Sequence, residues 1–136
     1  MRRPDARDIR ERAFEFACEV VRLHREISGG NGTVRVLSNQ LLRSGTAIGA
    51  NLEEGKGGHS RPDFIAKYTI ALKEARETHY WLRLLAACDL VPARRISPLV
   101  GEANEIVAII TTIVKNTKGG KKAESGAEQE PGGVQD

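Results

Sequence analysis

The chain has 136 residues, of which 40% are hydrophobic and only 4% aromatic, and its formal net charge is +3. This length fits one domain with a single core and excludes two, and an apolar content carried by Ala, Leu, Ile and Val favours packed helices over a β-sandwich or barrel. The mildly basic charge could favour a polyanionic partner but falls short of a dedicated nucleic-acid-binding arm.

Glycine-rich segments end the first two predicted helices. The first helix is expected from about Asp5 to Ile27, where apolar residues recur three and four positions apart and Asp8 pairs with Arg12 on the solvent side. The segment SGGNG at residues 28–32 ends this helix. The second helix is expected from about Val34 to Glu54, where GKGGH interrupts the pattern.

The third predicted helix has the clearest start signal in the chain. Ser60 is followed three residues later by Asp63, as in a capping box, and Pro62 falls in the first turn, where its missing N–H is harmless. This helix should continue to about Cys88. A fourth helix is expected over roughly residues 93–117.

Short connections between long amphipathic helices make consecutive helices antiparallel neighbours. The sequence therefore predicts an all-α protein, an antiparallel up-down-up-down four-helix bundle over residues 5–117. Residues 118–136 consist mainly of Gly, Lys and Glu and contain almost no apolar side chains, which predicts a disordered C-terminal tail.

The chain shows no targeting or membrane signal. Its first residues lack the apolar region of a signal peptide, and the longest apolar run, residues 106–114, is too short to span a bilayer. We therefore expect a cytoplasmic protein without a membrane partner. In that compartment Cys18 and Cys88 should be reduced and act as small core hydrophobes.

Polar residues interrupt the apolar stripes of the second and third predicted helices. Asn51 and Glu54 are three positions apart on one helix, as are Glu74 and Glu77 on the other. If these faces meet, arginines of the same helices can join them in a hydrogen-bonded cluster that fixes the helix register. The predicted structural polar cluster consists of Arg43, Asn51, Glu54, Glu74, Arg76 and Glu77.

Carboxylates on facing bundle helices can also hold a di-iron centre, but such centres require Glu-x-x-His on two helices. Only Glu77 and His79 bring the two residue types close together, and their spacing is wrong. His24 and His59 have no neighbouring serine or cysteine that would form a nucleophile–base pair. We therefore predict a non-enzymatic protein with no catalytic residue, metal site or cofactor.

Four residues are predicted to mediate close packing or a subunit interface. Gly45 and Gly49 each cost about 1 kcal/mol relative to alanine inside a helix, so another helix, in the bundle or in a neighbouring subunit, should fit closely against them. Tyr80 and Trp81 are adjacent and point about 100° apart, so both cannot readily enter one core. One of them is expected near the surface as an interface anchor.

Arginines gather at the starts of the first and fourth predicted helices. Arg3, Arg7 and Arg10 share one face of the first helix, and Arg94 and Arg95 open the fourth. Three lysines begin the predicted tail: Lys118, Lys121 and Lys122. One interpretation is solubility, since the first helix also carries interleaved acids. The other is a phosphate-binding rim, repeated around an oligomer, that binds RNA or DNA through charge rather than base readout.

The two middle helices also carry a recognisable set of residues: Ala47-Ile48-Gly49-Ala50-Asn51, Glu54-Gly55, Ser60, Asp63-Phe64, Ala71-Leu72, Ala75, Glu77 and Leu82. In this pattern the chain resembles the four helix bundle protein family, also called the 23S rRNA intervening-sequence protein family. Members are often encoded in insertions within bacterial large-subunit rRNA genes. The chain departs from the commoner family pattern at Glu53 and His79.

The resemblance implies a bacterial protein with an antiparallel four-helix fold, assembled as a homopentamer and without a settled enzymatic activity. Our first hypothesis is a non-enzymatic scaffold that binds nucleic acid or an RNA-associated partner through basic surfaces. Accessory proteins of diversity-generating retroelements are similar in fold to this family. The alternative is therefore an accessory factor of a retroelement reverse transcriptase.

Overall fold

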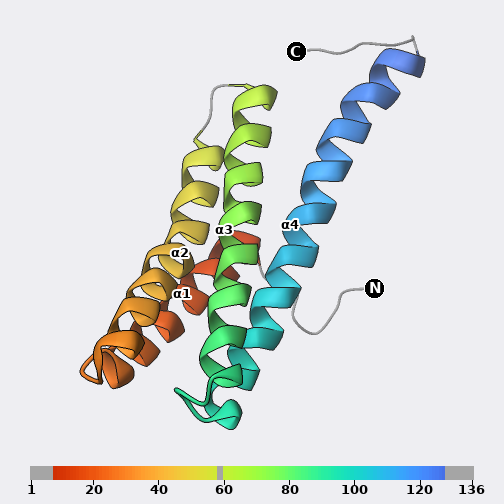
Figure 1. The fold of residues 1–136 in the computed structure, drawn as a ribbon. Coiled ribbons are helices and arrows are strands. Elements are labelled where there is room, and N and C mark those ends of the chain that lie inside the picture. Colours follow the sequence, from red (N-terminus) through yellow and green to blue (C-terminus); the bar gives the residue numbers. More distant parts are fainter. Residues whose placement is uncertain (1–7, 58–59, 128–136) are drawn as a thin grey trace.

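The computed structural model describes residues 8–57 and 60–127, with side chains described up to Gly119. It contains four helices: α1 (Ile9–Ile27), α2 (Gly32–Lys56), α3 (Arg61–Ala87) and α4 (Ala93–Ala127). Consecutive helices pack side by side and α1 also contacts α4, so α1 and α3 are diagonal to each other (Figure 1). The predicted antiparallel up-down-up-down four-helix bundle is confirmed.

Side chains cap the first three helices. The Asp8 carboxylate accepts a hydrogen bond from the Arg10 backbone N–H at 2.8 Å, and the Ser60 hydroxyl accepts one from Asp63 at 3.2 Å. Asn31 caps α2 in the same way. Each bond satisfies an N–H without a partner inside the helix. The Ser60 cap confirms its sequence signal, whereas the expected start near Asp5 is wrong, because Asp8 is non-helical and caps a helix that begins at Ile9.

The α3–α4 turn reverses the chain through a Schellman motif. Asp89 adopts a left-handed conformation with φ of 58°. The N–H of Leu90 bonds to the carbonyl of Leu85 at 3.0 Å, and that of Asp89 to the carbonyl of Ala86 at 3.1 Å. These bonds satisfy carbonyls that would otherwise be unpaired at the helix end.

One apolar core runs through the bundle. From α4 it takes a stripe at helical spacing: Ile96, Leu99, Ala103, Ile106, Ile110 and Val114. The two cysteines are free thiols but do not belong to this core. Cys88 is exposed at the C-cap of α3 and Cys18 is half-buried, so the prediction that both fill the core is wrong.

Two glycines of α2 face α1. A Cβ atom at Gly45 would lie 2.9 Å from Cγ1 of Val20, closer than real Cβ contacts, so only glycine fits there. At Gly49 the nearest atom would be the Cβ of Ala13 at 3.6 Å, an ordinary van der Waals distance. Both glycines therefore face α1 within one chain, and the close packing requires glycine only at Gly45.

On its other side α2 fits closely against α3. A Cβ atom at Gly55 would lie 2.9 Å from the ring of Tyr68, so this position also accepts only glycine. Farther along, the hydroxyl oxygens of Ser44 and Thr78 are fully buried and lie 2.8 Å apart. Each hydroxyl meets a hydrogen-bonding partner in the core, which holds the α2–α3 register.

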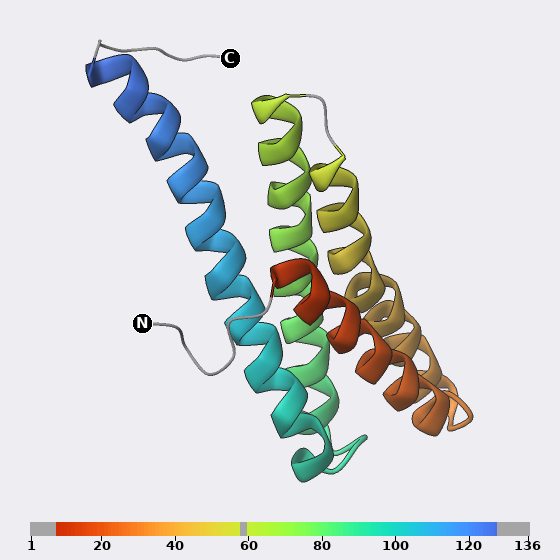
Figure 2. The same ribbon diagram turned by 180° about the vertical axis from the view of Figure 1, so that it is seen from behind.

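α4 is longer than expected. Its helical backbone passes the predicted end near Thr117 and reaches Ala127, although Gly119, Gly120 and Gly126 disfavour a helix there. The helix projects past the ends of α2 and α3 in both views (Figures 1 and 2). The rest of the predicted tail, residues 128–136, lies outside the described residues.

The composition of α4 also bears on membrane binding. By length and composition alone, residues 93–119 could cross a membrane. The core helix of a soluble bundle has the same composition, and α4 packs an apolar stripe into the core. The absence of a membrane partner stays a prediction.

Gly45→Ala should destabilise the protein although alanine is the better helix former. The gain in helix propensity is about 1 kcal/mol, whereas overpacking a filled core typically costs about 1–3 kcal/mol. We therefore expect the free energy of unfolding, measured by urea denaturation, to fall by about 1 kcal/mol. Gly49→Ala is the matched control: its Cβ has room, and it should raise that free energy by about 1 kcal/mol. A stabilised Gly45→Ala variant would contradict the close fit.

Candidate functional site

A polar cluster lies at the outer edge of the α2–α3 interface. Arg43 on α2 contacts two carboxylates of α3: its Nη1 lies 3.3 Å from Oε1 of Glu74, and its Nη2 donates to Oε2 of Glu77. The indole Nε1 of Trp81 donates to the same Glu77 oxygen at 3.2 Å. One arginine thus ties α2 to two carboxylates three residues apart on α3.

The other three residues predicted for this cluster lie elsewhere. Asn51 donates to a backbone carbonyl of its own helix at 2.9 Å, Glu54 pairs with Lys67 at 2.8 Å, and Arg76 is exposed. The prediction of a single six-residue cluster is wrong, because Asn51 lies about 12 Å along α2 from Arg43. The α2–α3 register therefore presents these residues to different parts of α3.

The two adjacent aromatic residues separate as their sequence positions require. Tyr80 is 52% exposed, whereas Trp81 is half-buried against the core. Their ring centroids lie 5.2 Å apart at an interplanar angle of 71°, an edge-to-face arrangement. Tyr80 is therefore the residue available to an interface, and the interface itself stays a prediction.

Two of the arginines predicted to bind phosphate are paired within the chain. The Nη2 of Arg10 lies 2.8 Å from a carboxylate oxygen of Asp8, and Arg95 donates to both oxygens of Glu26 at 3.0 and 2.8 Å. These side-chain hydrogen bonds lower the pKa of Asp8 and of Glu26 and raise the pKa of each arginine. Both guanidinium groups already bind a carboxylate.

The remaining members of the predicted phosphate-binding rim are Arg94, which is exposed at the start of α4, and Arg3 and Arg7, which lie outside the described residues. Pairing makes Arg10 and Arg95 weaker sites for an external phosphate, because a carboxylate already neutralises each guanidinium and takes two of its five N–H donors. Among the described arginines of this set, Arg94 alone is exposed.

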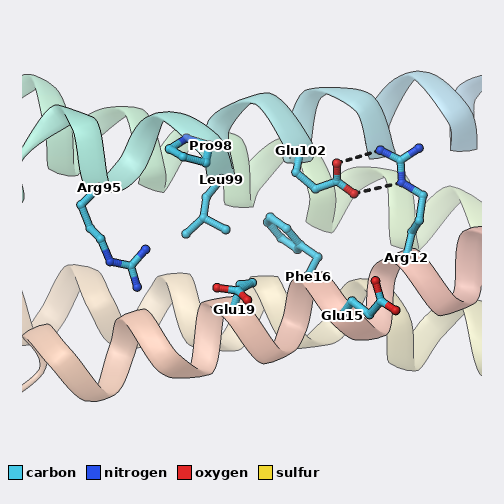
Figure 3. A pocket seen from close by; sticks show the side chains of 8 residues that line it. All are labelled: Arg12, Glu15, Phe16, Glu19, Arg95, Pro98, Leu99 and Glu102. Carbon is cyan, nitrogen blue, oxygen red and sulfur yellow. Dashed lines mark hydrogen bonds and ion pairs between the residues drawn. The ribbon is translucent and has the colours of Figure 1, made fainter. Parts of the chain in front are cut away.

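A groove of about 290 Å³ lies between α1 and α4 (Figure 3). Arg12 on α1 forms a bidentate ion pair with Glu102 on α4, with N–O distances of 3.0 and 2.7 Å. Phe16 and Leu99 extend towards each other from the two helices (Figure 3). The complete lining is Arg12, Glu15, Phe16, Glu19, Arg95, Pro98, Leu99 and Glu102.

Sequence reasoning missed the pair formed by Arg12 and Glu102. It assigned Arg12 to the solvent side with Asp8, yet Arg12 is only 5% exposed. The signal was its place on the apolar stripe, three residues after Ile9 and four before Phe16. A charge at such a position needs a hydrogen-bonding partner of opposite sign, which a carboxylate from another helix can supply.

No group of three or more His, Cys, Asp and Glu side chains that could hold a metal ion occurs among the residues described. The carboxylates of the polar cluster and of the groove are instead bound by arginines and by Trp81. Carboxylates bound in this way link neighbouring helices to each other. The predicted lack of a metal, a cofactor and an enzymatic activity remains a prediction.

Comparison with known proteins identifies the family of this chain. The family model for the 23S rRNA-intervening sequence protein matches residues 6–112. The chain belongs to this family. The matched region ends at Thr112 inside α4, so the last part of that helix lies beyond it.

This intervening-sequence protein also resembles a solved structure. The similar chain is a protein with unknown function from the S23 ribosomal protein family of Bacteroides thetaiotaomicron, with a TM-score of 0.75 and 38% sequence identity. The match covers 79% of this chain and 99% of that one. No curated protein matches. Family and fold are therefore shown, and the biochemical activity has to be argued from the molecule itself.

Arg12→Ala should lower the free energy of unfolding of this family member by about 2 kcal/mol, because Glu102 loses its bidentate partner. A fully buried pair would lose more, but the Glu102 side chain is 29% exposed and regains water. Arg22→Ala is the control, since the exposed Arg22–Glu19 pair should contribute less than about 1 kcal/mol. Equal losses in urea denaturation would show that burial does not strengthen the Arg12 pair.

Asp8→Asn should destabilise the protein in a pH-dependent way. Asparagine keeps an oxygen acceptor for the helix cap but removes the charge bound by Arg10. The pKa of Asp8 lies below its ordinary value of 3.8, so the charge stabilises the fold above that pH and its contribution disappears as the pH falls through the lowered pKa. Wild type should be the more stable at neutral pH, and the two should converge in acid. A difference that persists in acid would assign the effect to the cap alone.

Proposed function

We propose that this protein is a non-enzymatic homo-oligomeric scaffold that binds nucleic acid through charge. The observation that supports assembly is the exposure of large hydrophobic side chains on the diagonal helices α1 and α3, and of Val36 on α2, which is 61% exposed. The α1 face consists of Phe14, 68% exposed, and Val21. The α3 face consists of Ile70 and Tyr80. Exposed apolar groups of this size are typical of interaction surfaces when they gather on one face.

The placement of these faces favours a ring. Because α1 and α3 are diagonal and do not contact each other, the two faces lie on different sides of the bundle. A two-fold dimer buries the same patch on both subunits, whereas two different patches meet head to tail and close into a ring when the rotation permits. The family resemblance supplies the expected number of subunits, five.

The positive net charge of the protein supports nucleic acid as its partner. Each subunit carries a net charge of +3, and a ring multiplies it. Phosphate binding by lysine and arginine requires no base readout, and aromatic residues for stacking are few in this chain. The reverse-transcriptase accessory role stays a prediction from resemblance, and no feature of the described residues favours it. The cytoplasmic location stays a prediction from the sequence pattern.

Phe14→Glu and Tyr80→Glu should each break the ring, because each places a charge on one side of the head-to-tail contact. Light scattering after size exclusion should show an oligomer for wild type and smaller species for the variants, down to the 14.9 kDa monomer. Circular dichroism should show unchanged helicity. Ala108→Glu, which adds the same charge at an exposed position of α4, is the control and should leave the oligomer intact.

A mixture of the two variants distinguishes the mode of assembly. The Phe14→Glu subunit keeps an intact α3 face and the Tyr80→Glu subunit an intact α1 face, so a head-to-tail contact predicts one heterodimer on mixing. A symmetric contact through either face would instead leave one variant fully assembled alone. A monomeric wild-type protein at micromolar concentration would overturn the proposed assembly.

A further inference from the structure

A stretch near the end of α4 carries charge of one sign. Between Glu105 and Glu124 every charged residue is a lysine: Lys115, Lys118, Lys121 and Lys122. The backbone is helical through this stretch and beyond it to Ala127. We call residues 115–122 the lysine arm. It lies outside the region matched by the family model, so it belongs to this chain rather than to the shared fold.

The described lysines of the arm differ in their environment from several arginines of the bundle. Lys115 and Lys118 are exposed, and neither forms an ion pair with any described residue. By contrast, Arg10, Arg43 and Arg95 each bind a carboxylate of this chain. Internal pairing neutralises part of the positive charge of the bundle, whereas Arg25, Lys73, Arg76 and Arg83 stay exposed. The arm differs from these in that its four lysines lie within eight consecutive residues.

The arm is also free of the core. Val114 is the last buried residue among the side chains described for α4, and the helix end projects past α2 and α3 in both views (Figures 1 and 2). Positions 115, 118 and 122 fall within about 60° around the helix axis and span about 10 Å along it. One strand of a duplex places about three phosphates in that length, at about 3.4 Å each. The spacing therefore suits a phosphate backbone.

We propose that the lysine arm is the phosphate-binding element of this protein, for the sugar-phosphate backbone of RNA or DNA, in place of the arginines that begin α1 and α4. This proposal rests on the proposed nucleic-acid-binding function and names the element that performs it. Binding through the arm is independent of sequence, because residues 115–127 contain no aromatic side chain that could stack on a base.

A membrane surface fits the arm less well than nucleic acid does. A helix that lies on a bilayer needs bulky apolar residues opposite its basic face. Residues 115–127, KNTKGGKKAESGA, contain no apolar residue larger than alanine. The chemistry present is positive charge without an apolar anchor, which is the chemistry that phosphate backbones require.

The test measures binding of a short fluorescent single-stranded RNA, and of a DNA of the same sequence, to the full chain by anisotropy at several salt concentrations. The arm variant K115Q/K118Q/K121Q/K122Q should bind about tenfold or more weakly, and the slope of log K against log salt should fall by about 0.7 for each phosphate that is no longer neutralised. The matched control R25Q/K73Q/R76Q/R83Q removes as many exposed charges from the bundle and should bind nearly as wild type.

The same four positions changed to arginine should restore binding, because the charge returns. Light scattering and circular dichroism on each variant should show that assembly and helix content are kept, since Lys115 and Lys118 are exposed. A third variant, R10Q/R94Q/R95Q, tests the arginines that begin α1 and α4 and should leave the affinity close to that of wild type.

Each of the following results would overturn the proposed phosphate-binding role of the lysine arm. If the wild-type protein and the arm variant bind equally well, the proposed role of the arm is wrong, whereas nucleic-acid binding by the protein is confirmed. Equal losses of affinity in the arm variant and its matched control would mean that only net charge matters. Preference of the wild-type protein for phosphatidylserine vesicles over RNA and DNA would assign the arm to membranes. Absence of any RNA or DNA binding at low salt would overturn both the arm and the proposed nucleic-acid partner.

Discussion

The close approach of α2 to both of its neighbours is the constraint on which the bundle depends. Gly45 leaves no room for a Cβ atom beside Val20, and Gly55 leaves none beside Tyr68. With both separations held, the helices can interlock in only a narrow range of registers, because a filled core does not yield to sliding. The contacts of Arg43 with its two carboxylates on α3 follow from that register.

α4 is attached in a different way, and this difference shapes the surface of the protein. Two bidentate ion pairs, Arg12–Glu102 and Arg95–Glu26, link it to α1 around an open groove. The same pairs neutralise arginines that would otherwise attract a polyanion. Exposed positive charge without an ion pair among the described residues remains on α1 and α3, and also on the last part of α4, where the helix leaves the bundle (Figure 1).

Assembly and phosphate binding support each other in this arrangement. A single arm with a few lysines binds a phosphate backbone weakly and is sensitive to salt. In the proposed ring several arms would meet one nucleic-acid strand, and linked weak sites gain affinity because the second contact is made at high effective concentration. The bundle would then serve chiefly to hold the arms at fixed positions relative to one another.

The sequence by itself determined the number of helices, their order and the Ser60 cap, because helical periodicity and capping are local properties of the chain. It also predicted that Tyr80 and Trp81 must separate. The tertiary structure alone decided that Arg12 is buried, that Asn51 stays apart from Arg43 and where α4 ends. Side-chain partners across helices depend on register and crossing angle, and these are set by packing of the whole core rather than by neighbours along the chain.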